Sequence, residues 1–266
     1  MAAAPAPSAP RRGTFGRRLR RTVVAAVTVL VLLVVVFLVY AHTVLPGDRT
    51  AALRVWRDDR VAVRDVGDAV VMTPTGDGGG TAANGVGIVF VPGAKVDPFA
   101  YMATFRGVVA HGTTVVITKP TLNLAFFDLR PLSTFEAAAP SIRTWAVGGH
   151  SLGGVRACQL AAGSGPGTAP AGLLLLGSYC ANDLSHTRLD VLSLAGSRDG
   201  LSTPAKVAAA RNRLPASADM VEIPGANHAR FGAYGVQPGD GTATASRASV
   251  DRTITRQVDA WVATLR

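Results

Sequence analysis

One short segment constrains the fold of this chain more than any other. An apolar run at residues 145–147 stops at two glycines, and the pentapeptide Gly149-His150-Ser151-Leu152-Gly153 follows, ahead of a helix-forming segment at 152–162. The pattern G-x-S-x-G between a strand and a helix is typical of a nucleophile elbow, which holds its serine in a strained backbone conformation. Glycines are needed there because a Cβ would collide with the neighbouring strand or helix. We therefore predict a reactive Ser151 hydroxyl at a strand end, with the N–H of Leu152 directed at a developing oxyanion.

Apolar strand patterns alternate with helical patterns around this segment. Continuous apolar strands separated by helices indicate a mostly parallel sheet with helices on both faces, an α/β fold. Residues 61–65 and 69–72 flank a Gly67-Asp68 turn and predict an antiparallel hairpin at the start of the sheet. This regularity argues against a plain Gly/Ser loop at Ser151, which the 29 glycines of the chain would otherwise permit. The predicted strands are 87–91, 114–117, 145–147, 173–176, 191–195 and 220–223, and the predicted helices are 99–110, 132–139, 152–162, 204–213 and 250–265.

The positive charge of the chain is concentrated near its N-terminus. The net charge is +10, from 27 Lys and Arg against 17 Asp and Glu. Six of these bases lie between Arg11 and Arg21, ahead of the first acid at Asp48, so the remainder carries 21 bases and 17 acids, a net charge of +4. That balance is ordinary for a solvated surface, and no aromatic-interleaved basic patch accompanies it. We therefore expect no nucleic-acid partner.

A long uncharged run follows the basic cluster. It covers residues 22–45, and from Val23 to Ala41 it is almost purely Val, Leu, Ala and Phe. A bilayer core of ~30 Å requires about 20 apolar residues in a helix, so the run predicts a transmembrane segment. The preceding arginines place the N-terminus in the cytoplasm and the remaining chain outside the cell membrane. The alternative is a cleaved signal peptide, with Val39 and Ala41 as the small residues of its cleavage site. The apolar run, however, is longer than the usual apolar region of a signal peptide, about 7–15 residues.

These patterns divide the chain into three predicted parts. Residues 1–21 form a disordered basic cytoplasmic tail, because the Ala/Pro-rich residues 1–10 have no pattern that could bury a core. Residues 22–45 form the transmembrane helix, a signal anchor. Residues 46–266 are long enough for one well-buried domain.

A serine nucleophile requires a histidine that accepts its proton and a carboxylate that orients the histidine. With a serine turn of this kind the chain order is Ser, then Asp or Glu, then His. Two histidines follow Ser151. His228 leaves the last predicted strand at the carboxyl edge of the sheet and is favoured, while His186 lies in a short loop and is the alternative.

The carboxylate is expected after the strand at residues 191–195. Asp199 stands there directly and is the favoured acid, although the pair Asp199-Gly200 is also a common turn. Asp183, after the preceding strand, is the alternative acid. The sequence thus predicts a triad of Ser151, His228 and Asp199.

A second oxyanion donor is expected in the loop after the first parallel strand. Pro92 cannot donate and Gly93 permits close backbone approach, so the N–H of Ala94 is the candidate. Lys95 and Lys119 both follow strand ends at this edge and are candidate contacts for an anionic substrate group. Their alternative role is that of solvated loop lysines.

Four other residues have simpler interpretations. His150 is expected to be a packing residue, and His111 fits a helix C-terminus, where positive charge is favourable. Cys158 lies about 10 Å along the helix that follows Ser151, at 1.5 Å per residue. Cys180 is expected near the top of the next strand. An exported domain permits a disulfide, but this offset argues against one, and the sequence leaves the pairing open.

The motifs together resemble the α/β-hydrolase superfamily. Residues 91–98, 120–125, 149–153 and 227–232 are similar to its compact dienelactone-hydrolase-like subgroup, and the resemblance covers roughly residues 83–266. It implies a serine hydrolase that acts on carboxylic esters without a metal or organic cofactor. Dienelactone hydrolases are expected to carry a cysteine nucleophile, whereas this chain has Ser151, so that particular activity is in doubt.

Many members of the superfamily insert a lid after the strand that follows the nucleophile helix. Residues 179–190 leave only about a dozen residues there, too few for a helical lid. We therefore expect an open, shallow site and no interfacially activated long-chain lipase.

The leading functional prediction is ester hydrolysis through acylation of Ser151, with His228 acting first as base and then as acid. Acyl transfer to an alcohol on the same residues is the alternative, and product analysis separates the two. A third hypothesis is a catalytically inactive, membrane-tethered binding protein, which the complete triad argues against. The sequence does not define the acyl group, the leaving group or the oligomeric state.

Overall fold

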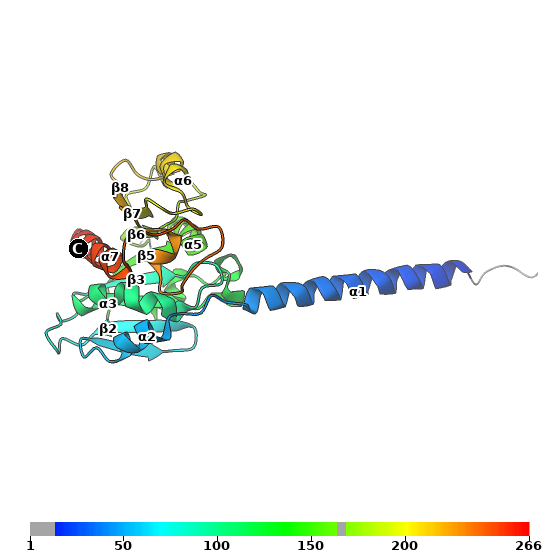
Figure 1. The fold of residues 1–266 in the computed structure, drawn as a ribbon, viewed down its shortest axis with the longest axis horizontal. Coiled ribbons are helices and arrows are strands. Elements are labelled where there is room, and N and C mark those ends of the chain that lie inside the picture. Colours follow the sequence, from blue (N-terminus) through cyan, green and yellow to red (C-terminus); the bar gives the residue numbers. More distant parts are fainter. Residues whose placement is uncertain (1–13, 164–168, 266) are drawn as a thin grey trace, which may run out of the picture. The chain divides into compact units, whose positions relative to one another are not determined.

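The computed structural model describes residues 14–163 and 169–265 (Figure 1). The chain divides into two compact units between Thr43 and Val44. Residues 1–13 of the tail predicted to be disordered lie outside the described residues, and residues 14–21 of that tail are helical, as the start of α1 (Thr14–His42).

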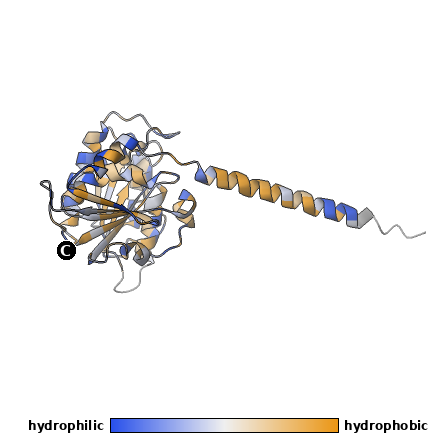
Figure 2. Ribbon diagram, turned by 90° about the horizontal axis from the view of Figure 1, so that it is seen from below, coloured by the Kyte–Doolittle hydropathy of each residue, from blue (hydrophilic) through white to orange (hydrophobic). Residues whose placement is uncertain are grey.

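The first unit is a single helix, α1 (Thr14–His42). Figure 2 shows that α1 is hydrophobic over most of its length and that hydrophilic residues gather near its N-terminal end. Gly16–His42 is long and apolar enough to cross a membrane, and its 27 residues span ~40 Å as a helix. The helix starts earlier than the predicted segment 22–45 and ends three residues before it, because Leu45 is already hydrogen-bonded within the second unit.

Eight strands form one sheet in the described part of the second unit, in the order β1-β2-β4-β3-β5-β6-β7-β8. β2 runs antiparallel to β1 and β4, and all other pairs are parallel. The predicted hairpin and the six predicted parallel strands are all present, with their ends shifted by no more than three residues. The strands are β1 (Val61–Asp65), β2 (Ala69–Pro74), β3 (Val86–Val91), β4 (Thr114–Thr118), β5 (Thr144–His150), β6 (Gly172–Leu176), β7 (Asp190–Gly196) and β8 (Asp219–Ile223).

All five predicted helices are present, and one helix was missed. Asp48 caps the missed helix by accepting hydrogen bonds from the backbone N–H groups of Thr50 and Ala51. No helix is predicted over residues 49–56 from the sequence patterns described above. The helices are α2 (Arg49–Trp56), α3 (Met102–Ala110), α4 (Leu132–Glu136), α5 (Leu152–Ala162), α6 (Pro204–Ala209) and α7 (Arg247–Val262), with 3₁₀ turns at Pro98–Tyr101, Thr121–Asn123, Ala125–Phe127, Arg211–Arg213 and His228–Phe231.

The inner strands β3, β4 and β6 are buried on both faces, which explains why they appear in the sequence as continuous apolar runs, whereas the edge strands β1 and β8 are largely exposed. Side chains of β6 alternate between the two cores. Leu174 and Leu176 pack with residues of α2, α3 and α7, and Leu173 and Leu175 pack with residues of α4 and α5. No helix occurs between β6 and β7 in the described chain, the position at which the sequence leaves too few residues for a helical lid.

A disulfide joins Cys158 to Cys180, contrary to the expectation that their offset would keep them apart. The expectation was wrong because the chain after β6 turns back along α5. Ser178 lies against Gly154 on the first turn of α5, and Asn182 donates to the carbonyl of Cys158 at 3.2 Å. Cys180, midway between them, therefore lies beside the second turn of the helix, with a Cα–Cα separation of 5.6 Å from Cys158.

Candidate functional site

Ser151 occupies the predicted turn between β5 and α5. Its backbone has φ 53° and ψ −124°, a conformation that costs a non-glycine residue about 1–3 kcal/mol. The neighbouring glycines make this turn possible. A Cβ on Gly149 would lie 2.3 Å from the carbonyl carbon of Gly153, and one on Gly153 would lie 2.1 Å from the carbonyl oxygen of Val91.

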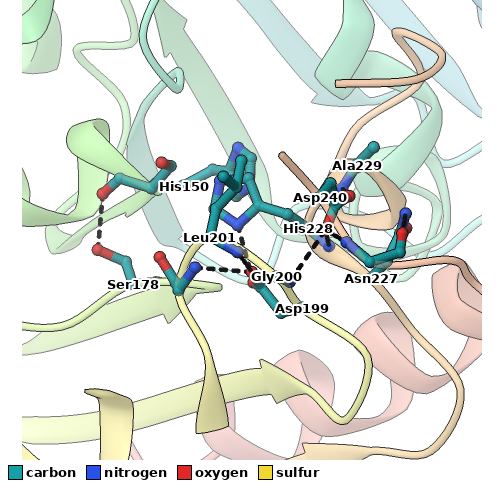
Figure 3. A network of polar contacts seen from close by, with 12 residues as sticks. His150, Ser178, Asp199, Gly200, Leu201, Asn227, His228, Ala229 and Asp240 are labelled. Carbon is teal, nitrogen blue, oxygen red and sulfur yellow. Dashed lines mark hydrogen bonds and ion pairs between the residues drawn. The ribbon is translucent and has the colours of Figure 1, made fainter. Parts of the chain in front are cut away.

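Ser178 supports this turn from the loop after β6. Its hydroxyl, labelled in Figure 3, donates to the carbonyl oxygen of Ser151 at 2.6 Å. The N–H of Ser151 donates to the carbonyl oxygen of Leu176 at 3.2 Å. Gly154 is required here as well, because a Cβ would lie 2.3 Å from the Ser178 hydroxyl. Sequence reasoning missed Ser178, since nothing local distinguishes it from any loop serine.

Asp199 and His228 form a buried pair at the same edge of the sheet. Asp199 Oδ2 lies 2.7 Å from His228 Nδ1, and both side chains are 0% exposed (Figure 3). The other carboxylate oxygen accepts from the N–H groups of Leu201 and Ser202 at 2.9 and 2.7 Å, which fixes the orientation of the carboxylate. These two residues follow β7 and β8, as the sequence predicted.

The ring of His228 presents its second nitrogen without a partner. An ionised carboxylate only accepts hydrogen bonds, so Nδ1 carries the proton of the neutral ring and Nε2 carries the lone pair. Nε2 is buried and has no hydrogen-bond partner among the described residues. No hydrogen bond joins it to the Ser151 hydroxyl in the described chain; in serine enzymes this bond is often long before substrate binds.

Asp240 holds the loops that carry this pair, and sequence reasoning missed it. One of its carboxylate oxygens accepts from the N–H groups of Gly200, His228 and Gly241 at 3.1, 3.0 and 2.7 Å. The other accepts from the N–H of Ala229 at 2.9 Å (Figure 3). In the sequence, Asp240 stands between two glycines and is indistinguishable from a turn aspartate.

His150 is buried beside His228, with 4.3 Å between the ring centroids. The Tyr101 hydroxyl accepts from the N–H of Gly93 at 2.9 Å and therefore donates to His150 Nδ1 at 2.8 Å. Burial, and then the repulsion that a protonated His228 would exert, hold the pKa of His150 well below its ordinary value. Burial also raises the pKa of Tyr101, so both groups are neutral. His150 is the packing residue that was expected.

Two backbone N–H groups near Ser151 are unpaired within the described chain. Leu152 begins α5, where an N–H finds no acceptor in its own helix, and the N–H of Ala94 also has no acceptor. The next residue, Lys95, has φ 57° and donates its N–H to the carbonyl of Asn123 at 2.8 Å. The positive-φ non-glycine residues of the described chain are all in loops after β3, β4 and β5: Lys95, Leu122, Asn123 and Ser151.

The alternative acid and base, and the two candidate substrate contacts, take no part in the Asp199–His228 pair. Asp183 and His186 are exposed, and Asp183 accepts from the N–H of Ser185 in a local turn. Lys119 Nζ lies 2.5 Å from Asp65 Oδ1, an ion pair that counts against its predicted contact with substrate. That contact, and the one predicted for Lys95, remain predictions. The described residues contain no group of three or more His, Cys, Asp or Glu that could hold a metal ion.

Residues 87–252 match the profile of the Alpha/beta hydrolase family. The chain belongs to this family. No curated protein matches the sequence.

Solved structures share the fold at low identity. TT1662 from Thermus thermophilus is 15% identical, with a TM-score of 0.54 over 76% of this chain and 98% of that one. A thermophilic esterase, Est2 from the Planctomycetes species Thermogutta terrifontis, is 10% identical, with a TM-score of 0.51 over 79% of this chain and 96% of its own. At these identities the likeness concerns the fold alone.

Proposed function

We propose that this protein is a membrane-anchored serine hydrolase that cleaves carboxylic esters through an acyl-enzyme on Ser151. The observation that carries the proposal is the fully buried Asp199–His228 pair, at the same sheet edge as the strained Ser151. A buried carboxylate that fixes the tautomer of a histidine is the arrangement needed to make a serine nucleophilic.

Each residue then has a defined step. The Ser151 hydroxyl attacks the ester carbonyl while His228 Nε2 takes its proton, and Asp199 stabilises the imidazolium. The N–H groups of Leu152 and Ala94 stabilise the oxyanion of the tetrahedral intermediate. His228 then protonates the departing alcohol. Water, deprotonated by His228, attacks the acyl-enzyme and releases the acid and free Ser151.

The choice of esters rests on similarity. The Est2 structure is described as propionate bound, which fits a short carboxylic acyl group in a site of this fold. The motif resemblance to dienelactone-hydrolase-like proteins favours the same class, with Ser151 in place of their cysteine. The absence of a helix between β6 and β7 favours an open site.

Helix α1 supports an anchor with the hydrolase unit outside the cell membrane. The arginines that precede the apolar run favour a cytoplasmic N-terminus. The mass of the protein extracted from expressing cells tests this. An intact chain in the membrane fraction agrees with an anchor, and a soluble chain cleaved after residue 41 would replace it with a signal peptide.

Hydrolysis of p-nitrophenyl esters of increasing chain length tests the activity. For the best substrate, we expect Ser151→Ala to lower kcat by about 10⁴-fold or more, because no other group can form the acyl-enzyme. His186→Ala serves as the matched control for His228→Ala and should retain kcat within about twofold. Equal activity of wild type and Ser151→Ala would disprove the proposal.

A further inference from the structure

The connection between α1 and the hydrolase unit is very short. α1 ends at His42, and Leu45 already belongs to the hydrolase unit: its N–H donates to the carbonyl of Lys95 at 2.6 Å, and its carbonyl accepts from the N–H of Asp97 at 3.1 Å. Consecutive Cα atoms are about 3.8 Å apart, so His42 and Leu45 are separated by at most about 11 Å, whatever the direction of the helix. The covalent chain therefore keeps the end of the apolar span close to the Lys95 loop.

That attachment point lies at the catalytic edge of the sheet. Lys95 follows Ala94, the proposed oxyanion donor, in the loop that leaves β3. The last residue of β3, Val91, pairs in register with Gly149 of the serine turn, and Gly153 packs against the carbonyl of Val91. The chain therefore joins the hydrolase unit at the loop after β3, and β3 is the strand that pairs with β5, which leads into Ser151.

The most exposed large apolar side chains of the hydrolase unit lie in two loops at this edge. Three such side chains in the described unit are more than half exposed: Phe126 at 52%, Leu129 at 82% and Val236 at 90%. Single exposed apolar residues are ordinary on protein surfaces. Here all three occur at one edge, rather than being scattered over the domain.

Backbone hydrogen bonds link both loops to the segment at residues 45–48, one directly and one through Lys95. The loop that carries Val236 includes Ala233, whose carbonyl accepts from the N–H of Asp48 at 2.6 Å. The loop that carries Phe126 and Leu129 includes Asn123, whose carbonyl accepts from Lys95, and the carbonyl of Lys95 accepts from Leu45. The exposed apolar residues therefore lie in the two loops that are linked to the start of the hydrolase unit.

We propose that the catalytic edge of the hydrolase unit rests on the membrane surface, with Phe126, Leu129 and Val236 inserted among the lipids, and that the substrate is an amphiphilic carboxylic ester held in that membrane. The proposal depends on the proposed function and on the anchor. A permanently tethered enzyme without a lid meets such an ester at the bilayer and needs no interfacial activation. The ester enters from the membrane side, and its polar product leaves towards water.

Membrane contact is measured on the full chain in phosphatidylcholine vesicles. Because Cys158 and Cys180 are paired, a cysteine introduced as Leu129→Cys, Val236→Cys or Met220→Cys takes a single polarity-sensitive fluorophore. Met220 is the control, an exposed residue on the edge strand β8. Labels at positions 129 and 236 should be blue-shifted and quenched by nitroxide-labelled lipid, and the label at position 220 should not. Three labels with the same water-like emission would overturn the proposal.

The substrate class is tested with two fluorogenic esters on the same full-length protein. 4-Methylumbelliferyl oleate is placed in the vesicle membrane, and 4-methylumbelliferyl butyrate is dissolved in the buffer. The double variant Leu129→Asp/Val236→Asp should hydrolyse the oleate about tenfold more slowly and the butyrate within about twofold of wild type. Hydrolysis of the butyrate but not the oleate by the wild type, equal effects of the variant on both esters, or no effect on the oleate would overturn the proposal and leave the proposed function intact. Failure of the wild type on both esters would instead remove the proposed function and this inference together.

Discussion

Two aspartate–histidine pairs of almost equal length occur at opposite edges of the sheet. Asp199 and His228 are 2.7 Å apart at the carboxyl edge, and His111 and Asp259 are 2.6 Å apart beside the start of β4. The first pair is 0% exposed, whereas the side chains of the second are 55% and 31% exposed. The same contact is therefore a fully buried pair in one place and a partly solvated contact at the C-terminal end of α3 in the other.

The two aspartate–histidine pairs also differ in the residues that surround them. The second pair borders a groove of about 740 Å³ between α3 and α7, which is lined by arginines and aspartates. Two of its arginines, Arg60 and Arg106, pair with Asp58 and hold the pKa of that carboxylate well below its usual range, whereas Asp251 Oδ1 is buried and has no hydrogen-bond partner among the described residues. The carboxyl edge combines a buried, unpartnered His228 Nε2 with backbone strain at Ser151. Burial combined with backbone strain therefore identifies the candidate site better than the volume of a surface groove does.

The sharpest test of this comparison removes the charge from each aspartate. Asp199→Asn should lower kcat by about 10³–10⁴-fold, because the amide favours the wrong tautomer of His228. Asp259→Asn should leave kcat within about twofold of wild type, since its pair is exposed and far from Ser151. Ester hydrolysis by the two purified variants measures the difference. Similar kinetics for both would show that the buried pair has no special role.

The disulfide joins the second turn of α5 to the loop that follows β6. Its loop of about 22 residues predicts a loss of about 3 kcal/mol in the free energy of unfolding for Cys158→Ala/Cys180→Ala. Guanidinium denaturation of the detergent-solubilised chain measures it. An unchanged midpoint would mean that the bridge adds no stability.

Asp240 and Asp259 provide a further pair of matched carboxylates. Asp240→Ala removes four backbone hydrogen bonds that join the loops carrying Asp199 and His228, and should cost about 2–3 kcal/mol of stability and lower kcat. Asp259→Ala removes one exposed ion pair and should cost less than about 1 kcal/mol. Thermal unfolding and ester hydrolysis check both expectations. A larger loss for Asp259→Ala would reverse the comparison.

Substitution of Asp251, which lines the groove, should have the smallest effect on the free energy of unfolding, and that effect should depend on pH. Burial raises the pKa of Asp251 to about 6, above its ordinary value near 4. The folded protein then holds a proton that the unfolded chain releases, so stability falls as pH rises from about 4 to 6 and stays lower above it. Asp251→Asn should therefore add about 1–2 kcal/mol of stability at pH 7 and nothing at pH 4, as measured by thermal unfolding. Asp219→Asn, at an exposed carboxylate on β8, is the control and should change neither value.

The parts that could be predicted from the sequence depend on local patterns. Continuous apolar strands require a sheet covered on both faces. The glycines around Ser151 are predicted to be needed for steric reasons, and in the structure a Cβ at these positions would collide with neighbouring atoms. Because the ends of parallel strands share one edge, the proximity of Asp199 and His228 also followed from their positions after β7 and β8.

What the sequence could not predict depends on the paths of loops. The Cys158–Cys180 bridge required knowing that the chain after β6 turns back along α5. Ser178 and Asp240 act through backbone groups that are distant in sequence, which no local motif encodes. Helix α2 is the exception, because the capping side chain of Asp48 was a signal that could have been used.

Reaction of the full-length protein with a fluorophosphonate tests the central claim most directly, since the reagent bonds only to an activated serine. Peptide mass spectrometry should find one adduct, on Ser151, formed at the wild-type rate in His186→Ala and about 10³-fold or more slowly in His228→Ala. An adduct on another residue, or labelling of Ser151 that is unaffected by His228→Ala, would contradict the account.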